Sequence, residues 1–124
     1  MSADARSRYG ATPRKVEKPW GWELVWAEAD AYVGKLLFVR SGESLSLQYH
    51  EKKEETLYLY EGRIRLETER DGESEERLVD PGEAMHFPAG TRHRLEAIAE
   101  SVLFEVSTPE LDDVVRLEDR YGRT

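Results

Sequence analysis

Four side chains in this sequence carry nitrogen and oxygen atoms of the kind that bind divalent metal ions. Gln48 and His50 are separated by one residue, Glu55 follows shortly after them, and His93 comes much later in the chain. Two imidazoles, one carboxylate and one amide oxygen form a mixed ligand set that suits zinc, manganese, iron, cobalt or nickel. Four protein ligands can leave a position of the ion open for water or substrate, which is typical of a catalytic site.

The segment 45–50 has a pattern that would bring two of these ligands together. Its residues, Leu-Ser-Leu-Gln-Tyr-His, alternate strictly, which predicts a β-strand with Ser46, Gln48 and His50 on one face. The charged loop that follows is long enough to reverse the chain, so Glu55 is expected on the adjacent strand. His93 comes shortly after a Pro-Ala-Gly turn, at the start of another expected strand.

The rest of the chain indicates further short strands separated by turns. We expect strands at 32–40, 56–60, 64–70, 77–79, 84–87, 93–97 and 102–107. The Asp71–Gly72 pair predicts a hairpin, and residues 111–113 are expected to form one helical turn. Short strands with frequent turns favour an antiparallel sandwich or barrel, such as a jelly roll of two Greek keys.

Length and composition limit the classes of protein to which the chain can belong. Its 124 residues suit one domain, expected over residues 16–124 after a flexible arm at 1–15. The formal net charge of −8 disfavours nucleic acid and anionic membranes as partners. The lack of cysteine excludes disulfides and thiolate zinc sites. The N-terminus has no secretory signal pattern and no apolar run is long enough to span a membrane, so we expect a soluble cytoplasmic protein.

The spacing of glycine, proline and ligand residues resembles the two sequence motifs of the cupin superfamily. The first motif is matched by Gly42, Gln48, His50, Glu55 and Gly62, and the second by Gly82, Pro88, Gly90 and His93. Both occur in the expected order, with the predicted hairpin between them. The resemblance implies an all-β cupin double-stranded β-helix, an antiparallel jelly-roll barrel. It also implies one divalent metal ion bound by Gln48, His50, Glu55 and His93.

Departures from the general cupin pattern narrow the resemblance to one family. Gln48 stands where cupins usually have a first histidine, and a Gln-x-His start is similar to that of phosphomannose isomerases. Segments 18–21, 45–50, 88–96 and 111–123 resemble the cupin domain of type II mannose-6-phosphate isomerases, so the likeness covers residues 16–123. Ala97 replaces an asparagine that often closes the second motif. No Gly-rich nucleotide-binding loop is present, so the resemblance implies no guanylyltransferase activity.

This resemblance implies the interconversion of mannose 6-phosphate and fructose 6-phosphate through an enediol-type intermediate. Such a reaction needs a general base that moves a proton between C1 and C2 of the sugar. The candidates are Glu105, His86 and Lys35. Alternation places Leu103, Glu105 and Ser107 on one face of the last strand. If this face looks inward, the Glu105 carboxylate would be buried near the metal.

The substrate phosphate would require cationic side chains near the site. The candidates for this role are Lys53, Arg92, Arg94 and Arg120. Thr56 and Leu57 depart from the His-Trp pair that is usual in the family, which affects the substrate assignment more than the fold or the metal. A homodimer is expected, because an open jelly-roll sheet leaves an edge and an apolar face to cover.

Two alternatives to an isomerase remain open from the sequence. One is a different metal-dependent cupin enzyme, such as a small dioxygenase, because one fold hosts many reactions. The other is a non-catalytic sugar-binding module. Gln48 favours the isomerase over the dioxygenase, because iron oxygenases more often present three histidines, or two histidines with a carboxylate.

Overall fold

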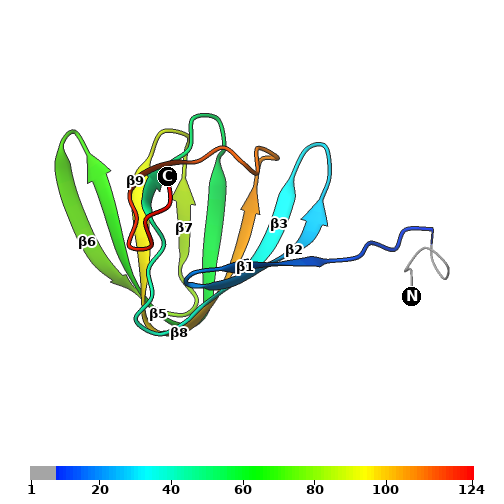
Figure 1. Cartoon of the computed structure of the whole chain (residues 1–124), viewed down its shortest axis with the longest axis horizontal. Helices are drawn as coiled ribbons and strands as arrows, with labels where there is room; N and C mark the ends of the chain where they lie inside the picture. Colours follow the sequence, from blue (N-terminus) through cyan, green and yellow to red (C-terminus); the bar gives the residue numbers. More distant parts are fainter. Residues whose placement is uncertain (1–7) are drawn as a thin grey trace.

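The computed structural model describes residues 8–124, and within this range the chain is folded entirely as β-strands and connecting loops (Figure 1). The strands are β1 (Arg14–Lys18), β2 (Gly21–Glu28), β3 (Val33–Val39), β4 (Leu47–Tyr49), β5 (Glu55–Arg70), β6 (Glu73–Val79), β7 (Ala84–Phe87), β8 (Arg92–Ser107) and β9 (Val115–Glu118). The expected all-β class is confirmed. Among the described residues, no helix has the length and apolar character needed to cross a membrane.

All strand pairs are antiparallel and belong to one sheet that curls around a common interior (Figure 1). The order along one path is β1-β2-β3-β8-β4-β9, and β5 pairs with β6, β7 and β8. Strands β5 and β8 have 16 residues each and pair along most of their length. The β5–β8 pair therefore joins the strands that pair with β8 (β3 and β4) to those that pair with β5 (β6 and β7).

A bend in the β5–β8 ladder lets the sheet fold back on itself. The register shifts between Leu59 and Ile64, which marks a β-bulge. Gly62 lies there with a φ of 98°, and a Cβ atom at this position would lie 2.2 Å from the Ser101 Oγ. Glycine is thus required both by the backbone conformation and by the close approach of the partner strand.

The hydrophobic core fills the interior of the curled sheet with side chains from alternate strand positions. Its members include Leu37, Leu57, Leu59, Ile64 and Leu103, all of which are 2% exposed or less. Burying such side chains stabilises the fold by about 1.5–3 kcal/mol each, which anchors the strands that carry the polar groups described below.

Several expected elements differ in extent from those that the structure shows. The strands expected at 56–60 and 64–70 form one strand, β5, because the turn expected around Gly62 is a bulge inside a continuous ladder. The segments at 93–97 and 102–107 merge in the same way into β8. Between the arms of the β5–β6 hairpin, Asp71 and Gly72 both have positive φ, as the sequence predicted for its turn.

The two ends of the chain also differ from expectation. Strand pairing begins at Arg14, inside the arm expected over 1–15, because β1 pairs with β2. Residues 1–7 of that arm lie outside the described residues. The helical turn expected at 111–113 is wrong, because short-range backbone bonds such as Val114 N to Asp112 O close tight turns there instead. The chain then enters β9, which pairs with β4.

Candidate metal centre

A polar cavity of about 390 Å³ opens into the interior of the curled sheet. Its walls come from β1 to β5, β8 and the C-terminal segment after β8. The polar lining includes Gln48, His50, Lys53, Glu55, His93 and Glu105. Ser46, Gln48 and His50 all line the cavity, as the alternation of segment 45–50 predicts, and Leu45 lines it as well.

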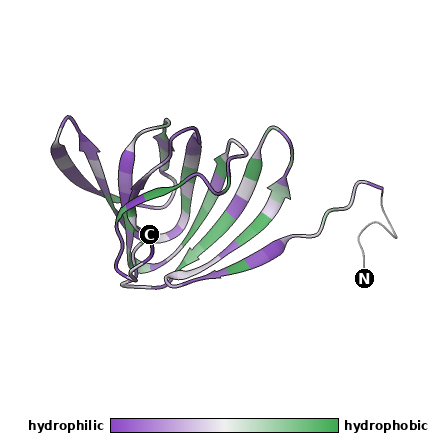
Figure 2. Cartoon of the chain, turned by 45° about the horizontal axis from the view of Figure 1, so that its top comes forward, coloured by the Kyte–Doolittle hydropathy of each residue, from purple (hydrophilic) through white to green (hydrophobic). Residues whose placement is uncertain are grey.

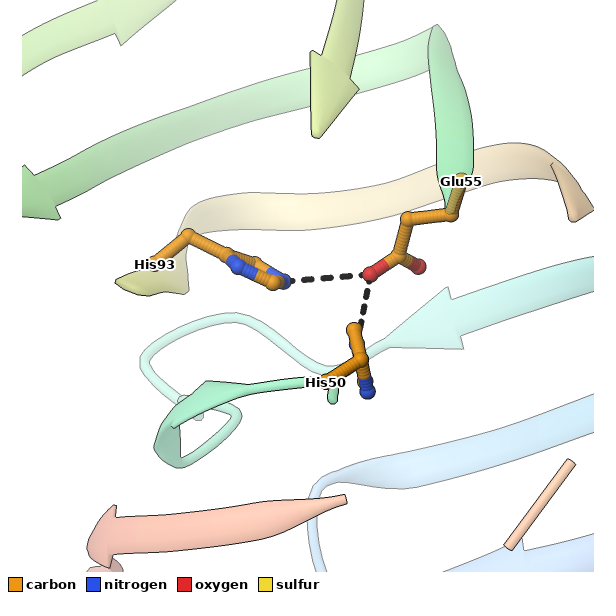
Figure 3. A group of neighbouring side chains, drawn as sticks. All are labelled: His50, Glu55 and His93. Atoms are coloured by element: carbon orange, nitrogen blue, oxygen red, sulfur yellow. Dashed lines mark hydrogen bonds and ion pairs between the residues drawn. The ribbon is translucent and has the colours of Figure 1, made fainter. Parts of the chain in front are cut away.

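Three of the four expected metal ligands converge on one point in this cavity (Figure 3). Glu55 is the first residue of β5, His50 directly follows β4, and His93 is the second residue of β8. The Nε2 atom of His50 lies 2.7 Å from the Glu55 Oε2, and the Nε2 of His93 lies 3.2 Å from the same oxygen. One ligand atom from each residue lies within 4.8 Å of the others, so this group could hold a metal ion.

Both imidazoles are held through their other ring nitrogen. The Nδ1–H of His50 donates to the carbonyl oxygen of Asp113 at 2.5 Å, and that of His93 donates to the carbonyl of Thr91 at 2.9 Å. The ring of His93 also stacks on Phe87, with centroids 4.1 Å apart. These contacts direct both Nε2 atoms into the cavity, and a metal-ligating histidine uses its second nitrogen in the same way.

Gln48 lies beside this cluster on β4. It pairs across the ladder with His93 on β8. Its amide oxygen accepts a hydrogen bond from the hydroxyl of Ser46 at 3.1 Å. The Ser46 hydroxyl therefore orients the amide of Gln48 in a cavity that both residues line.

The carboxylate of Glu55 is kept ionised by its neighbours. Burial alone would raise its pKa, but hydrogen bonds from His50 and His93 outweigh burial, and the ammonium of Lys53 adds to them. The pKa of Glu55 is therefore held well below its usual range. An ionised carboxylate beside two imidazole nitrogens is the donor chemistry that a divalent cation requires, so the described residues fit such an ion.

A second buried carboxylate lies close to the first. Glu105 on β8 is 4% exposed, and its Oε2 lies 3.1 Å from the Nζ of Lys53, which is 3.8 Å from Glu55. Burial raises the pKa of Glu105, and the charge of Glu55 adds to this rise, although Lys53 opposes it. The pKa of Lys53 is also raised, because attraction to Glu105 and Glu55 outweighs the opposing effect of burial.

Lys35 lies beside Glu105 in the wall of the same cavity. It pairs across the β3–β8 ladder with Glu105, but its ammonium bonds Glu23 of β2 at 3.3 Å. Both side chains of this Lys35–Glu23 pair are largely buried. Lys18 adds a longer contact to Glu23 at 3.8 Å.

The remaining candidates from the sequence lie away from the cavity lining. His86 points outward from β7 and bonds the exposed Glu54. Arg92 is exposed and lies near the ring of Tyr49. The other two arginines, Arg94 and Arg120, join carboxylates on the outer surface of the sheet, namely Glu67, Glu118, Glu43 and Glu96. Of the four cations expected to bind phosphate, only Lys53 lines the cavity with the metal-capable group.

Sequence reasoning missed other residues that the fold brings to the cavity. Arg116 of β9 lines it, and within residues 8–124 no hydrogen-bond partner reaches its buried Nε atom. The backbone carbonyl of Asp113 orients His50, as described above. Glu23 lines the cavity and pairs with Lys35, a contact that the sequence did not indicate. No local sequence pattern indicates that the C-terminal segment returns to β4. The spacing of residues along the chain therefore could not predict the roles of Asp113 and Arg116.

The sequence as a whole matches a known protein family. A family model of the mannose-6-phosphate isomerase C-terminal region matches residues 5–119. The mannose-1-phosphate guanylyltransferase ManC of Salmonella typhimurium is 36% identical over 99% of this chain and 26% of its own length. The xanthan biosynthesis protein XanB of Xanthomonas campestris is 33% identical over 90% of this chain and 24% of its own length. The chain thus spans about a quarter of the length of these curated relatives.

Solved structures with the same fold come from proteins of several kinds. KdgF from Halomonas has a TM-score of 0.69 and 21% identity, covering 82% of this chain and 91% of that protein. The capsular polysaccharide assembling protein CapF of Staphylococcus aureus has a TM-score of 0.75 and 16% identity, covering 90% and 33%. Oxalate decarboxylase of Bacillus subtilis has a TM-score of 0.74 and 19% identity, covering 90% and 32%. At these identities the likeness shows a shared fold alone.

Proposed function

The chain belongs to the mannose-6-phosphate isomerase C-terminal family and has the cupin fold, and on this premise we propose that it is a metal-dependent sugar-phosphate isomerase. The proposed reaction interconverts mannose 6-phosphate and fructose 6-phosphate by moving a proton between C1 and C2 through an enediol. The observation that carries the proposal is the convergence of His50, Glu55 and His93 in a cavity that also contains the buried Glu105.

Gln48, His50, Glu55 and His93 are the proposed ligands of one divalent ion, with zinc and manganese as the first candidates. The ion would supply electrophilic polarisation of the sugar carbonyl. Manganese receives support from a fold neighbour, because the oxalate decarboxylase of Bacillus subtilis has Mn(II) centres. The amide of Gln48 adds a neutral ligand, so the site would carry one negative charge, from Glu55, among four donors.

Glu105 is the proposed general base. Its carboxylate lines the cavity, and burial raises its pKa from the ordinary range for carboxyl groups, as proton transfer near neutral pH requires. The ammonium of Lys53 lies 3.1 Å from Glu105, which favours a fixed orientation of the carboxylate. Lys35 is less suited to this role, because its ammonium is engaged by Glu23.

Arg116 is the proposed contact for the phosphate group. A guanidinium binds phosphate with paired hydrogen bonds, and the buried Nε of Arg116 is a donor that the described residues leave unused. Lys53 remains a candidate from the sequence, although two carboxylates already surround its ammonium. Arg92, Arg94 and Arg120 are not included, because they lie outside the cavity lining.

A homodimer remains part of the proposal. The outward face of β2, β5 and β8 exposes a group of large apolar side chains, namely Trp26, Tyr58, Tyr60, Phe104 and Val106. A second copy of the chain would remove this surface from water. The cytoplasmic location and the expectation of no nucleic-acid or membrane partner stay predictions from the charge and composition. The small sugar phosphate stays a prediction from the family resemblance.

The proposed activity can be tested directly with the purified chain. Mannose 6-phosphate should be converted to fructose 6-phosphate with Zn²⁺, Mn²⁺ or Co²⁺, and a chelator should abolish the conversion. Glu55→Gln should lose both bound metal and activity, because the change removes the charged ligand. Glu54→Gln is the matched control, since Glu54 is an exposed neighbour with half of its side chain in solvent.

Other outcomes would point to the alternatives. Failure to convert the substrate with all three metals would overturn the isomerase proposal. Metal-dependent oxygen uptake would favour a dioxygenase, and binding of mannose 6-phosphate without turnover would favour a sugar-binding module.

A further inference from the structure

We propose that Asp113, in the segment between β8 and β9, is a positioning residue that sets the geometry of the candidate metal centre. This inference rests on the proposed metal site and extends it to a residue outside the four expected ligands. Asp113 touches the site at two places, through its backbone carbonyl and through its carboxylate. It belongs to the C-terminal segment that crosses over from β8 to reach β9 beside β4 (Figure 1).

The backbone carbonyl of Asp113 acts on His50 itself. It accepts the Nδ1–H of the imidazole at 2.5 Å, across 63 residues of sequence. A carbonyl oxygen can only accept a hydrogen bond, so this contact requires a proton on Nδ1. The Nε2 atom of His50 is then the nitrogen that faces Glu55, as a ligand must.

The carboxylate of Asp113 acts on the loop that connects the two ligands His50 and Glu55. Its Oδ1 accepts the backbone N–H of Glu51 at 3.0 Å. Its Oδ2 accepts those of Lys52 at 2.7 Å and Lys53 at 2.9 Å. Three backbone donors on one carboxylate hold the loop in a single conformation, and they lower the pKa of Asp113 to about 2.

These two sets of contacts support each other. The carboxylate fixes Asp113 against the loop, and this places its carbonyl at His50. The same loop carries Lys53, whose ammonium contacts both Glu55 and Glu105. Removing the carboxylate therefore frees the carbonyl, and one ring nitrogen of a ligand loses its partner. Partners of this kind commonly change metal affinity by about 10–100-fold.

The test measures Zn²⁺ and Mn²⁺ binding to the full chain by calorimetry. Asp113→Ala should weaken both affinities by about 10–100-fold. Asp113→Asn keeps one acceptor oxygen and should show a smaller loss. Asp30→Asn is the matched control, because it removes the same charge from an exposed residue outside the cavity lining and should keep the affinity of the parent chain.

A second measurement separates positioning from general loss of structure. In NMR spectra of the metal-free chain, Asp113→Ala should shift the ring resonances of His50 more than those of His93, whose Nδ1 bonds Thr91 instead. Equal shifts of both rings, or no shift of either, would overturn the proposal. Unchanged metal affinity in Asp113→Ala would overturn it as well.

The two proposals fail in different ways. If the parent chain binds neither ion, the proposed isomerase function is wrong, and the ring shifts of His50 alone decide the role of Asp113. If the parent chain binds metal and Asp113→Ala binds it equally well, the positioning role is wrong and the metal site stands.

Discussion

At the scale of single residues, the interior of this protein contains five buried Lys and Glu side chains among residues 8–124. Glu23, Lys35, Lys53, Glu55 and Glu105 are all 9% exposed or less. Each lies within 4 Å of an opposite charge, so desolvation is offset by pairing. Buried charges of alternating sign around an open cavity indicate chemistry more than stability, because an apolar core would cost less to form.

Glu105→Gln tests the role of this carboxylate. The change keeps the shape of the side chain but removes the proposed base, so isomerisation should fall by about 10²–10⁴-fold. Bound metal should stay at the level of the parent chain, because Glu105 is not a proposed ligand. Turnover of mannose 6-phosphate and metal content are the two measurements.

Glu100→Gln on the same strand is the control for this substitution, because Glu100 is exposed. Equal loss of activity in both variants would show that the effect is not specific to Glu105. Normal activity in Glu105→Gln would exclude the carboxylate as the base.

The sequence indicated part of this site and missed the rest. The resemblance of their spacing to the cupin motifs predicted that His50, Glu55 and His93 would meet, and they do. Alternation placed Glu105 on one face with Leu103 and Ser107, and the structure shows that this face is the buried one. Asp113 and Arg116 could not be predicted, because their roles depend on where a segment without regular periodicity crosses the sheet.

At the scale of elements, side chains hold the C-terminal segment from β9 onward in addition to its pairing with β4. Asp119 accepts hydrogen bonds from the guanidinium and the backbone N–H of Arg123. The Tyr121 hydroxyl accepts the backbone N–H of Ser44 at 3.2 Å and donates to Glu43. The Tyr121 contacts fasten the segment to the residues before β4, and the Asp119–Arg123 contacts close the turn that contains Tyr121.

The Asp119 carboxylate makes this fastening dependent on pH. Its side chain is 2% exposed, and the hydrogen bonds from Arg123 lower its pKa to about 2. Because the folded pKa lies below the unfolded value, the stabilisation is complete above about pH 4 and is lost as the pH falls towards 2. Asp119→Asn should thus lower the free energy of unfolding by about 1–2 kcal/mol at neutral pH.

Urea unfolding of the parent and variant chains at several pH values measures this effect. The difference between them should shrink as the pH falls from about 4 to about 2. Asp30→Asn, in the exposed β2–β3 connection, is the control and should change the stability little. A difference that persists at the lowest pH would contradict the assignment to ionised Asp119.

The sequence predicted where most strands lie, but it did not predict how long β5 and β8 are. A glycine between the β-rich segments 56–60 and 64–70 predicts a turn at Gly62, yet here it forms a bulge that bends β5 without ending it. The distinction depends on the close approach of Ser101 from β8, which local sequence does not encode. The Asp71–Gly72 turn was predictable because its conformation is set by those two residues alone.

At the scale of the whole molecule, the curled sheet has an uneven distribution of hydropathy. Figure 2 shows hydrophobic positions along the strands of the main body and mainly hydrophilic ones on the β5–β6 hairpin. The exposed aromatic group that includes Tyr60 and Phe104 lies on the outward face of the main body, with the two ring centroids 5.6 Å apart.

The proposed homodimer predicts a defined change in molecular mass. The parent chain should show twice the monomer mass in light scattering or sedimentation. Replacing Tyr60 and Phe104 together with glutamate should give a folded monomer, because like charges would face each other across the interface. Leu78→Glu on the hairpin, where Leu78 is 42% exposed, should stay dimeric. A parent chain that sediments as a monomer would contradict the proposal.

The distribution of the site along the chain has a consequence for how the protein is made. His50 and Glu55 are five residues apart, but the carbonyl that orients His50 comes 63 residues after it. During synthesis the two early ligands leave the ribosome long before Asp113, so the oriented centre is among the last features to form. A newly made chain would therefore complete the proposed metal site only after the segment that carries Asp113 has been synthesised.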